Sequence, residues 1–300
     1  MHLCTLCPRS CRTDRNEKRG VCGVPRDIYI SKIMLHQWEE PCISGSRGSG
    51  AVFFCGCPLG CRFCQNGEIS HGSNGAFAGQ RKFSEAELVS AMLELQEKGA
   101  NNVNFVSPTQ YTDTIIRVVA EAKARGLSLP IVWNTGGYEK AEVIRALEGT
   151  VDVFLTDMKY YSSDLSGELS SAPDYFETAL PALIEMCRIA GMPQYSDGLM
   201  TRGVIVRHLV LPGCRRDSEE VLKRLAEAGL TDKIVLSLMS QYTPDFFRGC
   251  PDEKLDRSMR RRVTTFEYNA VRDLAADLGF DGFGQERESA QKKYTPDWGF

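Results

Sequence analysis

Short apolar segments alternate with amphipathic ones through the middle of the chain, and this alternation is what most constrains the fold. The apolar segments are rich in β-branched and aromatic residues, as buried strands are, and they lie at residues 51–54, 102–106, 131–133, 151–155, 204–210 and 234–238. Segments with helical apolar spacing separate them, and Ser84 with Glu87 forms a capping box before the first. Repeated strand–helix units favour parallel strands with right-handed crossovers. We therefore predict an α/β fold, a partial (β/α)6 barrel.

The active site of such a barrel lies at the carboxyl ends of its strands. In this chain the residues after each predicted strand are polar or rich in glycine, unlike the strands themselves. They form a cysteine loop after the first strand and then the segments 107–110, 134–137, 156–159, 212–213 and 240–243. We expect these segments to line one pocket.

The loop after the first strand carries Cys57, Cys61 and Cys64 at C-x3-C-x2-C spacing. Three thiolates on one loop hold three irons of a [4Fe-4S] cluster and leave the fourth iron open to a ligand from outside the protein. An open iron implies chemistry, whereas a closed cluster implies electron storage. The alternative is a non-catalytic electron-transfer or metal-binding module, which needs a fourth protein ligand; Cys55 is the only nearby cysteine.

A second set of cysteines stands at the start of the chain, where Cys4, Cys7, Cys11 and Cys22 lie among several basic residues. A segment this short and charged has too little apolar mass to form its own core, so metal binding is a natural means of ordering it. Four thiolates suit zinc or a second iron-sulfur cluster. A flexible, reduced tail is the alternative.

The composition limits the class of protein. A chain of 300 residues with 42% hydrophobic and 25% charged residues can bury a large core as one main domain. Twelve clustered and scattered cysteines without a signal segment indicate a reducing compartment, so we expect a cytoplasmic protein. The net charge of -3 shows no general attraction to nucleic acid or acidic membranes. We expect neither as a partner.

These patterns divide the chain into four predicted parts. Residues 1–25 form a cysteine-rich metal-binding segment, and residues 26–50, which are rich in glycine and serine near their end, form a linker. Residues 51–245 form the barrel. Residues 246–300 hold a terminal helix and a polar tail, in which Tyr294, Trp298 and Phe300 are candidates to cover the mouth of the barrel.

Residues 50–245, with Phe63 directly before the third loop cysteine, resemble the radical S-adenosylmethionine (SAM) superfamily. Within that superfamily the chain is most similar to the activating enzymes of glycyl radical enzymes, pyruvate formate-lyase activating enzyme above all. The similar stretches are residues 207–213, the triplet Asp157-Met158-Lys159, and Asn134-Thr135-Gly136. The extra N-terminal cysteines set it among activase-like iron-sulfur proteins.

The resemblance implies a mechanism and its partners. SAM would chelate the open iron of a [4Fe-4S] cluster, and one electron from a reductant such as flavodoxin or ferredoxin would cleave it. The resulting 5'-deoxyadenosyl radical would take a hydrogen from a glycine of a partner protein. Radical modification of a small molecule, a peptide or RNA is the alternative.

The resemblance also implies site residues, of which Cys57, Cys61 and Cys64 would bind the cluster. The candidates for contact with SAM are Phe63, Asn66, Ser107, Thr109, Asn134, Thr135, Asp157, Lys159, Arg207 and Gln241. His208 is expected to be a hydrogen-bonded histidine within the sheet, and no catalytic residue is predicted. Two departures stand out, because residues 107–110 replace a Gly-Gly-Glu type segment that would hold the SAM amino group, and residues 241–243 replace a histidine.

Overall fold

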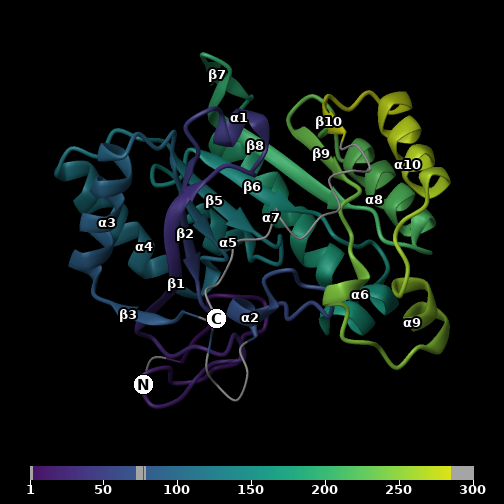
Figure 1. Ribbon diagram of the computed structural model, residues 1–300, viewed down its shortest axis with the longest axis horizontal. Helices are drawn as coiled ribbons and strands as arrows, with labels where there is room; N and C mark the ends of the chain where they lie inside the picture. The colour runs from purple at the N-terminus through teal and green to yellow at the C-terminus, as the bar shows by residue number, and fades with distance from the viewer. Residues whose placement is uncertain (1–2, 72–76, 78, 285–300) are drawn as a thin grey trace.

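Among residues 3–71, 77 and 79–284, which the computed structural model describes, ten strands form one sheet (Figure 1). Its centre consists of β2 (Ser49–Phe54), β4 (Val103–Val106), β5 (Ile131–Thr135), β6 (Val153–Asp157), β8 (Leu199–Leu209) and β9 (Val235–Met239). These six strands lie side by side in chain order and every neighbouring pair is parallel. They are the six predicted strands. The predicted α/β fold, a partial barrel, is confirmed.

Four further strands lie outside the predicted six. The strand β1 (Ile28–His36) pairs antiparallel with β2, and β3 (Arg81–Phe83) pairs antiparallel with β1. At the other edge β10 (Gly282–Gly284) pairs in parallel with β9, and β7 (Gln194–Ser196) pairs antiparallel with β8.

The linker predicted over residues 26–50 is wrong for most of that stretch. Residues 28–36 form β1, which is part of the sheet, and α1 (Pro41–Ser44) follows it. Ile28 and Ile30 alternate with less buried residues, so the strand has one core-facing side. The other predicted domain boundaries stay predictions, and the predicted tail beyond residue 284 lies outside the described residues.

Helices cover one face of the parallel strands (Figure 1). The longer ones are α3 (Glu85–Glu97), α4 (Thr112–Ala124), α7 (Tyr175–Ala190), α8 (Arg215–Glu227) and α10 (Thr265–Asp277). The other helices besides α1 are α2 (Gly67–Ser70), which packs on the opposite face, and α5 (Ala141–Arg145), α6 (Ser163–Ser170) and α9 (Glu253–Met259), with single turns at Thr109–Tyr111 and Pro244–Phe246. The predicted capping box is present at α3, where the Ser84 hydroxyl accepts the Glu87 amide at 3.2 Å.

The two faces of the sheet bury different sets of side chains, because successive residues of a strand point to opposite sides. Trp133 and Phe154 pack with the long helices in the larger core. On the other face Val132, Val153 and Ile205 pack with residues of α1 in a smaller core. The short helix α1 therefore covers part of this second face, and Ile69 of α2 packs on another part of it with Ala51 and Phe53. The cavity lined by Phe53 and Val106 opens on the same face. No helix within the described ranges is long and apolar enough to span a membrane.

Candidate active site

The cysteine loop leaves β2 through a glycine whose backbone conformation favours a residue without a side chain. Gly56 has a φ of +82°, and a Cβ atom there would stand 2.5 Å from the carbonyl oxygen of Cys22. The loop then brings Cys57, Cys61 and Cys64 to one cavity at the carboxyl ends of the strands. The structure thus gathers the three cysteines as the sequence predicts.

Most of the predicted SAM contacts reach the same cavity. Its lining includes Phe63, Asn66, Ser107, Asn134, Thr135, Asp157, Lys159, Arg207 and Gln241. Of the predicted contacts, Thr109 alone is not part of that lining. These side chains come from the carboxyl ends of six different parallel strands or from the loops after them, so the sheet topology rather than sequence proximity brings them together.

The cysteine sulfurs lie in a buried environment with hydroxyl groups beside them. The Ser170 hydroxyl, at the end of α6, donates to Cys61 Sγ at 3.0 Å, and Ser70 Oγ, at the end of α2, lies 3.3 Å from Cys64 Sγ. Burial raises the pKa of the Cys57 thiol to about 12. Thiolates at these positions therefore form by metal binding, and hydroxyl donors then stabilise their charge.

Three charged side chains form the polar wall of the cavity. Asp157, at the end of β6, pairs with Lys159 through one oxygen and accepts Arg207 Nε at 2.8 Å through the other. Burial alone would raise the pKa of Asp157, but the two cations lower it below its usual value. The same carboxylate raises the pKa of the buried Lys159, against the effect of desolvation. All three groups are therefore charged at neutral pH.

Arg207 is held by more than one partner. Its Nη2 donates to Asn134 Oδ1 at 2.7 Å, and its Nη1 lies 3.4 Å from Glu39 Oε2. The guanidinium is thus directed at protein groups on β5, β6 and the segment after β1. In this arrangement Arg207 positions Asp157 and Asn134 on the cavity wall.

Glu39 is a cavity residue that the sequence reasoning missed. Its Oε1 accepts the side-chain amides of Asn104 and Asn134, each at 3.1 Å, and its Oε2 faces Arg207. Burial raises the pKa of Glu39, although the Arg207 charge opposes that effect. The adjacent acidic residues 39 and 40 after an apolar segment were the available signal, but they lay in the predicted linker.

The segment after β4 anchors the neighbouring loops. The hydroxyls of Thr109 and Thr135 both donate to Glu139 Oε1 at 2.6 Å, and of the two only Thr135 lines the cavity. Gln110 Nε2 donates to the carbonyls of Cys55 and Gly56 at 3.0 and 3.1 Å. Sequence reasoning also missed Glu139, whose burial raises its pKa to about 7.

The aromatic and amide candidates have simple surroundings. Phe63 packs edge-on against Tyr160 and Tyr242, with ring centroids 6.4 and 6.1 Å away. Gln241 Nε2 lies 3.4 Å from the Met239 sulfur. His208 lies outside the cavity lining, where its Nδ1 is 2.6 Å from the Met158 carbonyl and burial lowers its pKa to about 4. His208 is therefore a neutral sheet histidine, as expected.

The N-terminal cysteines lie on a segment that contacts the cysteine loop. The Cys57 amide donates to the carbonyl of Cys22 at 3.1 Å, so the two cysteine motifs are in direct contact. Within residues 3–71, 77 and 79–284, no three His, Cys, Asp or Glu side chains are arranged to hold a single metal ion. The metal predicted for the N-terminal set stays a prediction.

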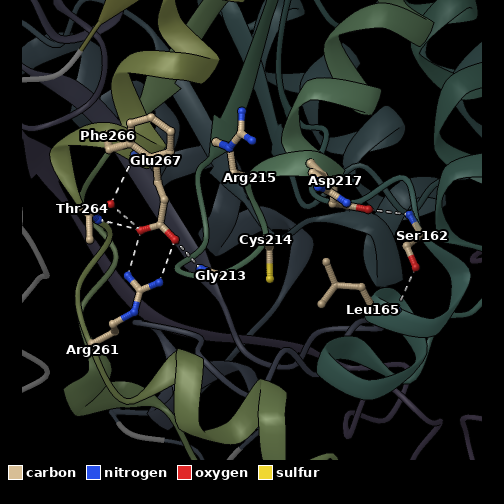
Figure 2. Close-up of a pocket in the computed structure, with 11 residues that line it drawn as sticks. Ser162, Leu165, Gly213, Cys214, Arg215, Asp217, Arg261, Thr264, Phe266 and Glu267 are labelled. Atoms are coloured by element: carbon tan, nitrogen blue, oxygen red, sulfur yellow. Dashed lines mark hydrogen bonds and ion pairs between the residues drawn. The ribbon is translucent and has the colours of Figure 1, made fainter.

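A second pocket opens where α8 and α10 begin, and none of the predicted site residues lines it (Figure 2). Glu267 lines this pocket, where it accepts the Gly213 amide at 2.8 Å and both terminal nitrogens of Arg261 at 2.7 Å. Gly213 follows β8, which also carries Arg207. At this pocket the hydrogen bond from Gly213 to Glu267 therefore links the loop after β8 to α10.

The family model of the Radical SAM superfamily matches residues 51–207, more than half of the chain. The chain belongs to the radical SAM superfamily. Membership implies a [4Fe-4S] cluster and SAM, and the three cysteines that share one cavity with strand-end polar groups fit both. The matches support membership of the superfamily but not the narrower resemblance to activating enzymes, which stays a proposal.

The relatives differ in how much they share with this chain. An uncharacterized protein of Methanocaldococcus jannaschii is 28% identical over 283 residues, which are 93% of this chain and 75% of that protein. The ribosomal RNA large subunit methyltransferase Cfr of Lachnoclostridium phytofermentans is 25% identical over 109 residues, only 35% of this chain and 27% of that enzyme. The crystal structure of methylornithine synthase (PylB) matches with a TM-score of 0.48 and 16% identity, covering 75% of this chain and 60% of that one.

Proposed function

We propose that this protein reductively cleaves SAM at a [4Fe-4S] cluster held by Cys57, Cys61 and Cys64, and abstracts a hydrogen atom from a glycine of a partner protein. The observation that carries the cleavage is that these cysteines share one cavity with Asp157 and Lys159. The bound cluster supplies the electron that breaks a carbon–sulfur bond of SAM, which yields methionine and a 5'-deoxyadenosyl radical.

The cavity side chains bind and orient the methionine end of SAM in this proposal. Lys159 is a buried cation that attracts the SAM carboxylate, and Asp157 is a buried anion that attracts its ammonium and sulfonium groups. Glu39 supplies the acceptor that the absent Gly-Gly-Glu type segment would otherwise provide. Arg207 holds both acids in place through its own hydrogen bonds.

The partner glycine is supported by the sequence resemblance to activating enzymes in residues 207–213, 157–159 and 134–136. The alternative substrates are a small molecule, a peptide or RNA. RNA has the one specific observation in its favour, because a relative that matches 35% of this chain is a ribosomal RNA methyltransferase by name.

The experiment mixes the reconstituted, reduced enzyme and SAM with a candidate glycyl radical enzyme under anaerobic conditions. We expect a glycyl radical signal in electron paramagnetic resonance (EPR) on the partner, with 5'-deoxyadenosine formed in proportion to the radical. A matched partner in which the candidate glycine is alanine should give no signal. Many turnovers of SAM without a partner radical would contradict the activating role and favour a conventional substrate.

A further inference from the structure

The N-terminal segment forms part of the wall behind the cysteine loop. Besides the bond from the Cys57 amide to the Cys22 carbonyl, Arg9 reaches across to the loop. Its Nε donates to the Pro58 carbonyl and its Nη2 to the Ser170 carbonyl, each at 2.8 Å. Ser170 is the residue whose hydroxyl donates to Cys61 Sγ. The segment is therefore fixed to the very loop that carries the SAM-site cysteines.

The N-terminal thiols are gathered in this segment. The sulfurs of Cys22 and Cys11 lie 3.4 and 3.6 Å from the point that a side chain on Gly20 would occupy, so Gly20 leaves space between them. The chain also folds back on itself near Cys4, whose amide donates to the Thr13 carbonyl at 3.0 Å and whose carbonyl accepts the Arg12 amide at 3.1 Å. The sulfurs of Cys11 and Cys22 therefore lie on the two sides of one glycine, and the backbone turns back on itself beside Cys4.

A buried cation lies beside these thiols. The Arg15 side chain is nearly inaccessible, and its Nη1 lies 4.0 Å from Cys4 Sγ while also donating to the Gln110 carbonyl at 2.5 Å. Gln110 in turn donates to Cys55 and Gly56 at the start of the cysteine loop. A buried positive charge stabilises the additional negative charge of a reduced cluster more than that of an oxidised one. Such a setting suits a redox centre better than a purely structural zinc ion.

We infer that Cys4, Cys7, Cys11 and Cys22 bind a second [4Fe-4S] cluster that passes electrons to the cluster at Cys57, Cys61 and Cys64. A reduced flavodoxin or ferredoxin gives one electron to the N-terminal cluster and is itself oxidised by one electron. That electron moves to the neighbouring cluster and from there to SAM, whose carbon–sulfur bond breaks. The contact between Cys22 and Cys57 makes this transfer short. The inference rests on the proposed SAM cleavage.

The first test counts metal in the full chain after anaerobic reconstitution. In the loop variant, with Cys57, Cys61 and Cys64 changed to alanine, we expect about four irons per chain to remain, against about eight in the wild type. Its reduced EPR signal should not respond to SAM. A Cys250→Ser variant, outside both motifs, should keep all the iron. Zinc in place of iron in the loop variant, or no metal at all, would overturn the assignment.

The second test concerns electron transfer. In the N-terminal variant, Cys4→Ser with Cys7→Ser, dithionite can still reduce the SAM-site cluster directly, so formation of 5'-deoxyadenosine should stay near the wild-type rate. With reduced flavodoxin as donor we expect that rate to fall by about tenfold or more, a difference of about 1.4 kcal/mol in activation free energy. Equal rates of the variant and the wild type with flavodoxin would contradict the relay.

The two proposals fail in different ways. If the wild type forms no 5'-deoxyadenosine with dithionite, the proposed function fails, while the iron count of the loop variant still decides the second cluster. If the N-terminal variant folds poorly, which circular dichroism would show, the loop variant still tests metal binding. The wild type then tests proximity, because two reduced clusters in contact should broaden each other's EPR signals, and unbroadened signals would overturn the relay.

Discussion

Asp157 is the residue on which the charges of the site depend, because each of its two oxygens pairs with a different buried cation. Removing one member of such a network leaves an unpaired buried charge, which costs far more than the net value of the pair. The roles of Lys159 and Arg207 can therefore be separated by changing one cation at a time.

We expect Arg207→Met to weaken SAM binding by about tenfold or more and to destabilise the fold by about 3 kcal/mol, because Asp157 and Glu39 both lose a partner. Arg207→Lys keeps the charge but cannot contact Asp157, Asn134 and Glu39 together. Its SAM affinity and its stability should therefore lie between those of Arg207→Met and those of the wild type. Equilibrium SAM binding and urea unfolding measure both effects. Wild-type binding by Arg207→Met would contradict the positioning role.

Glu139 gives a prediction about pH. Its folded pKa of about 7 lies above its usual value of 4.5 because of burial, so the folded state holds the proton more tightly than the unfolded state. Its contribution to stability is therefore present at low pH and is lost as the pH rises from about 4.5 to about 7, by about 3 kcal/mol. Above that range the loss is complete.

The matched variant is Glu139→Gln, which accepts the same hydroxyls of Thr109 and Thr135 and has no titration. Urea unfolding of both proteins should show the variant gaining about 3 kcal/mol relative to wild type between about pH 4 and about pH 8. A difference that does not change with pH would show that Glu139 has an ordinary pKa.

The role of a residue could be predicted where neighbouring positions in the sequence indicate it. Cys57, Cys61 and Cys64 could be predicted because their spacing is itself the signal. Glu39 and Glu139 could not, because their partners come from other elements: Arg207 is 168 positions from Glu39. A buried acid acquires its role only when the fold supplies its hydrogen-bond donors.

Among the elements, the loops after β5 and β6 are joined by one tyrosine. Tyr175 on α7 donates to the carbonyls of Gly136 and Asp157 at 2.8 and 3.0 Å, and accepts the Lys159 amide at 3.0 Å. This packing leaves no room at Gly137, where a Cβ atom would stand 2.0 Å from the Asp157 carbonyl oxygen.

We therefore expect Gly137→Ala to destabilise the protein by about 3 kcal/mol or more, since it combines steric conflict with an unfavourable φ of +81°. Gly149→Ala is the matched control. Its φ is +76° but nothing lies within 4 Å of the added atom, so strain alone should cost about 1 kcal/mol. Urea unfolding compares the two, and equal losses would contradict the packing argument.

The two capping boxes offer a second comparison between elements. Glu87 at α3 and Glu267 at α10 make the same bonds to their helix starts, but only Glu267 also accepts Gly213 and Arg261 (Figure 2). Arg261, more than the other partners, lowers the pKa of Glu267 to about 2.

We expect Glu87→Ala to cost about 1 kcal/mol, as loss of a cap does, without any change in SAM affinity. Glu267→Ala should cost about 3 kcal/mol and weaken SAM binding several-fold, because the loop after β8 is released. Similar effects of the two substitutions on SAM affinity would show that the hydrogen bond between Glu267 and Gly213 does not influence SAM binding.

Strand prediction succeeded where apolar residues run together and failed at the edges of the sheet and next to them. The central strands are buried on both faces, so their β-branched runs are plain in the sequence. The strand β1 has a mixed pattern next to a glycine-rich stretch, and β10 contains only Gly282, Phe283 and Gly284. Strands at the edge of the sheet or next to it are defined by their neighbours more than by their own composition.

For the whole molecule, the order of strand–helix units predicted the architecture because consecutive parallel units stack in chain order. The position of the N-terminal segment could not be predicted in this way. It depends on contacts such as those of Arg9 with Pro58 and Ser170, which lie 49 and 161 positions away. Whole-molecule features built from such distant contacts leave little local trace.

The central claim is that the loop from Cys57 to Cys64 holds a cluster with one iron open to SAM. The direct measurement is the EPR spectrum of the reconstituted, reduced protein before and after SAM is added, with 5'-deoxyadenosine counted in the same samples. We predict that SAM changes the spectrum and is cleaved in the wild type and in Cys250→Ser. In Cys61→Ala we predict that the spectrum does not respond to SAM and that SAM is not cleaved. A fully loaded wild type whose spectrum ignores SAM and which forms no 5'-deoxyadenosine would contradict the claim.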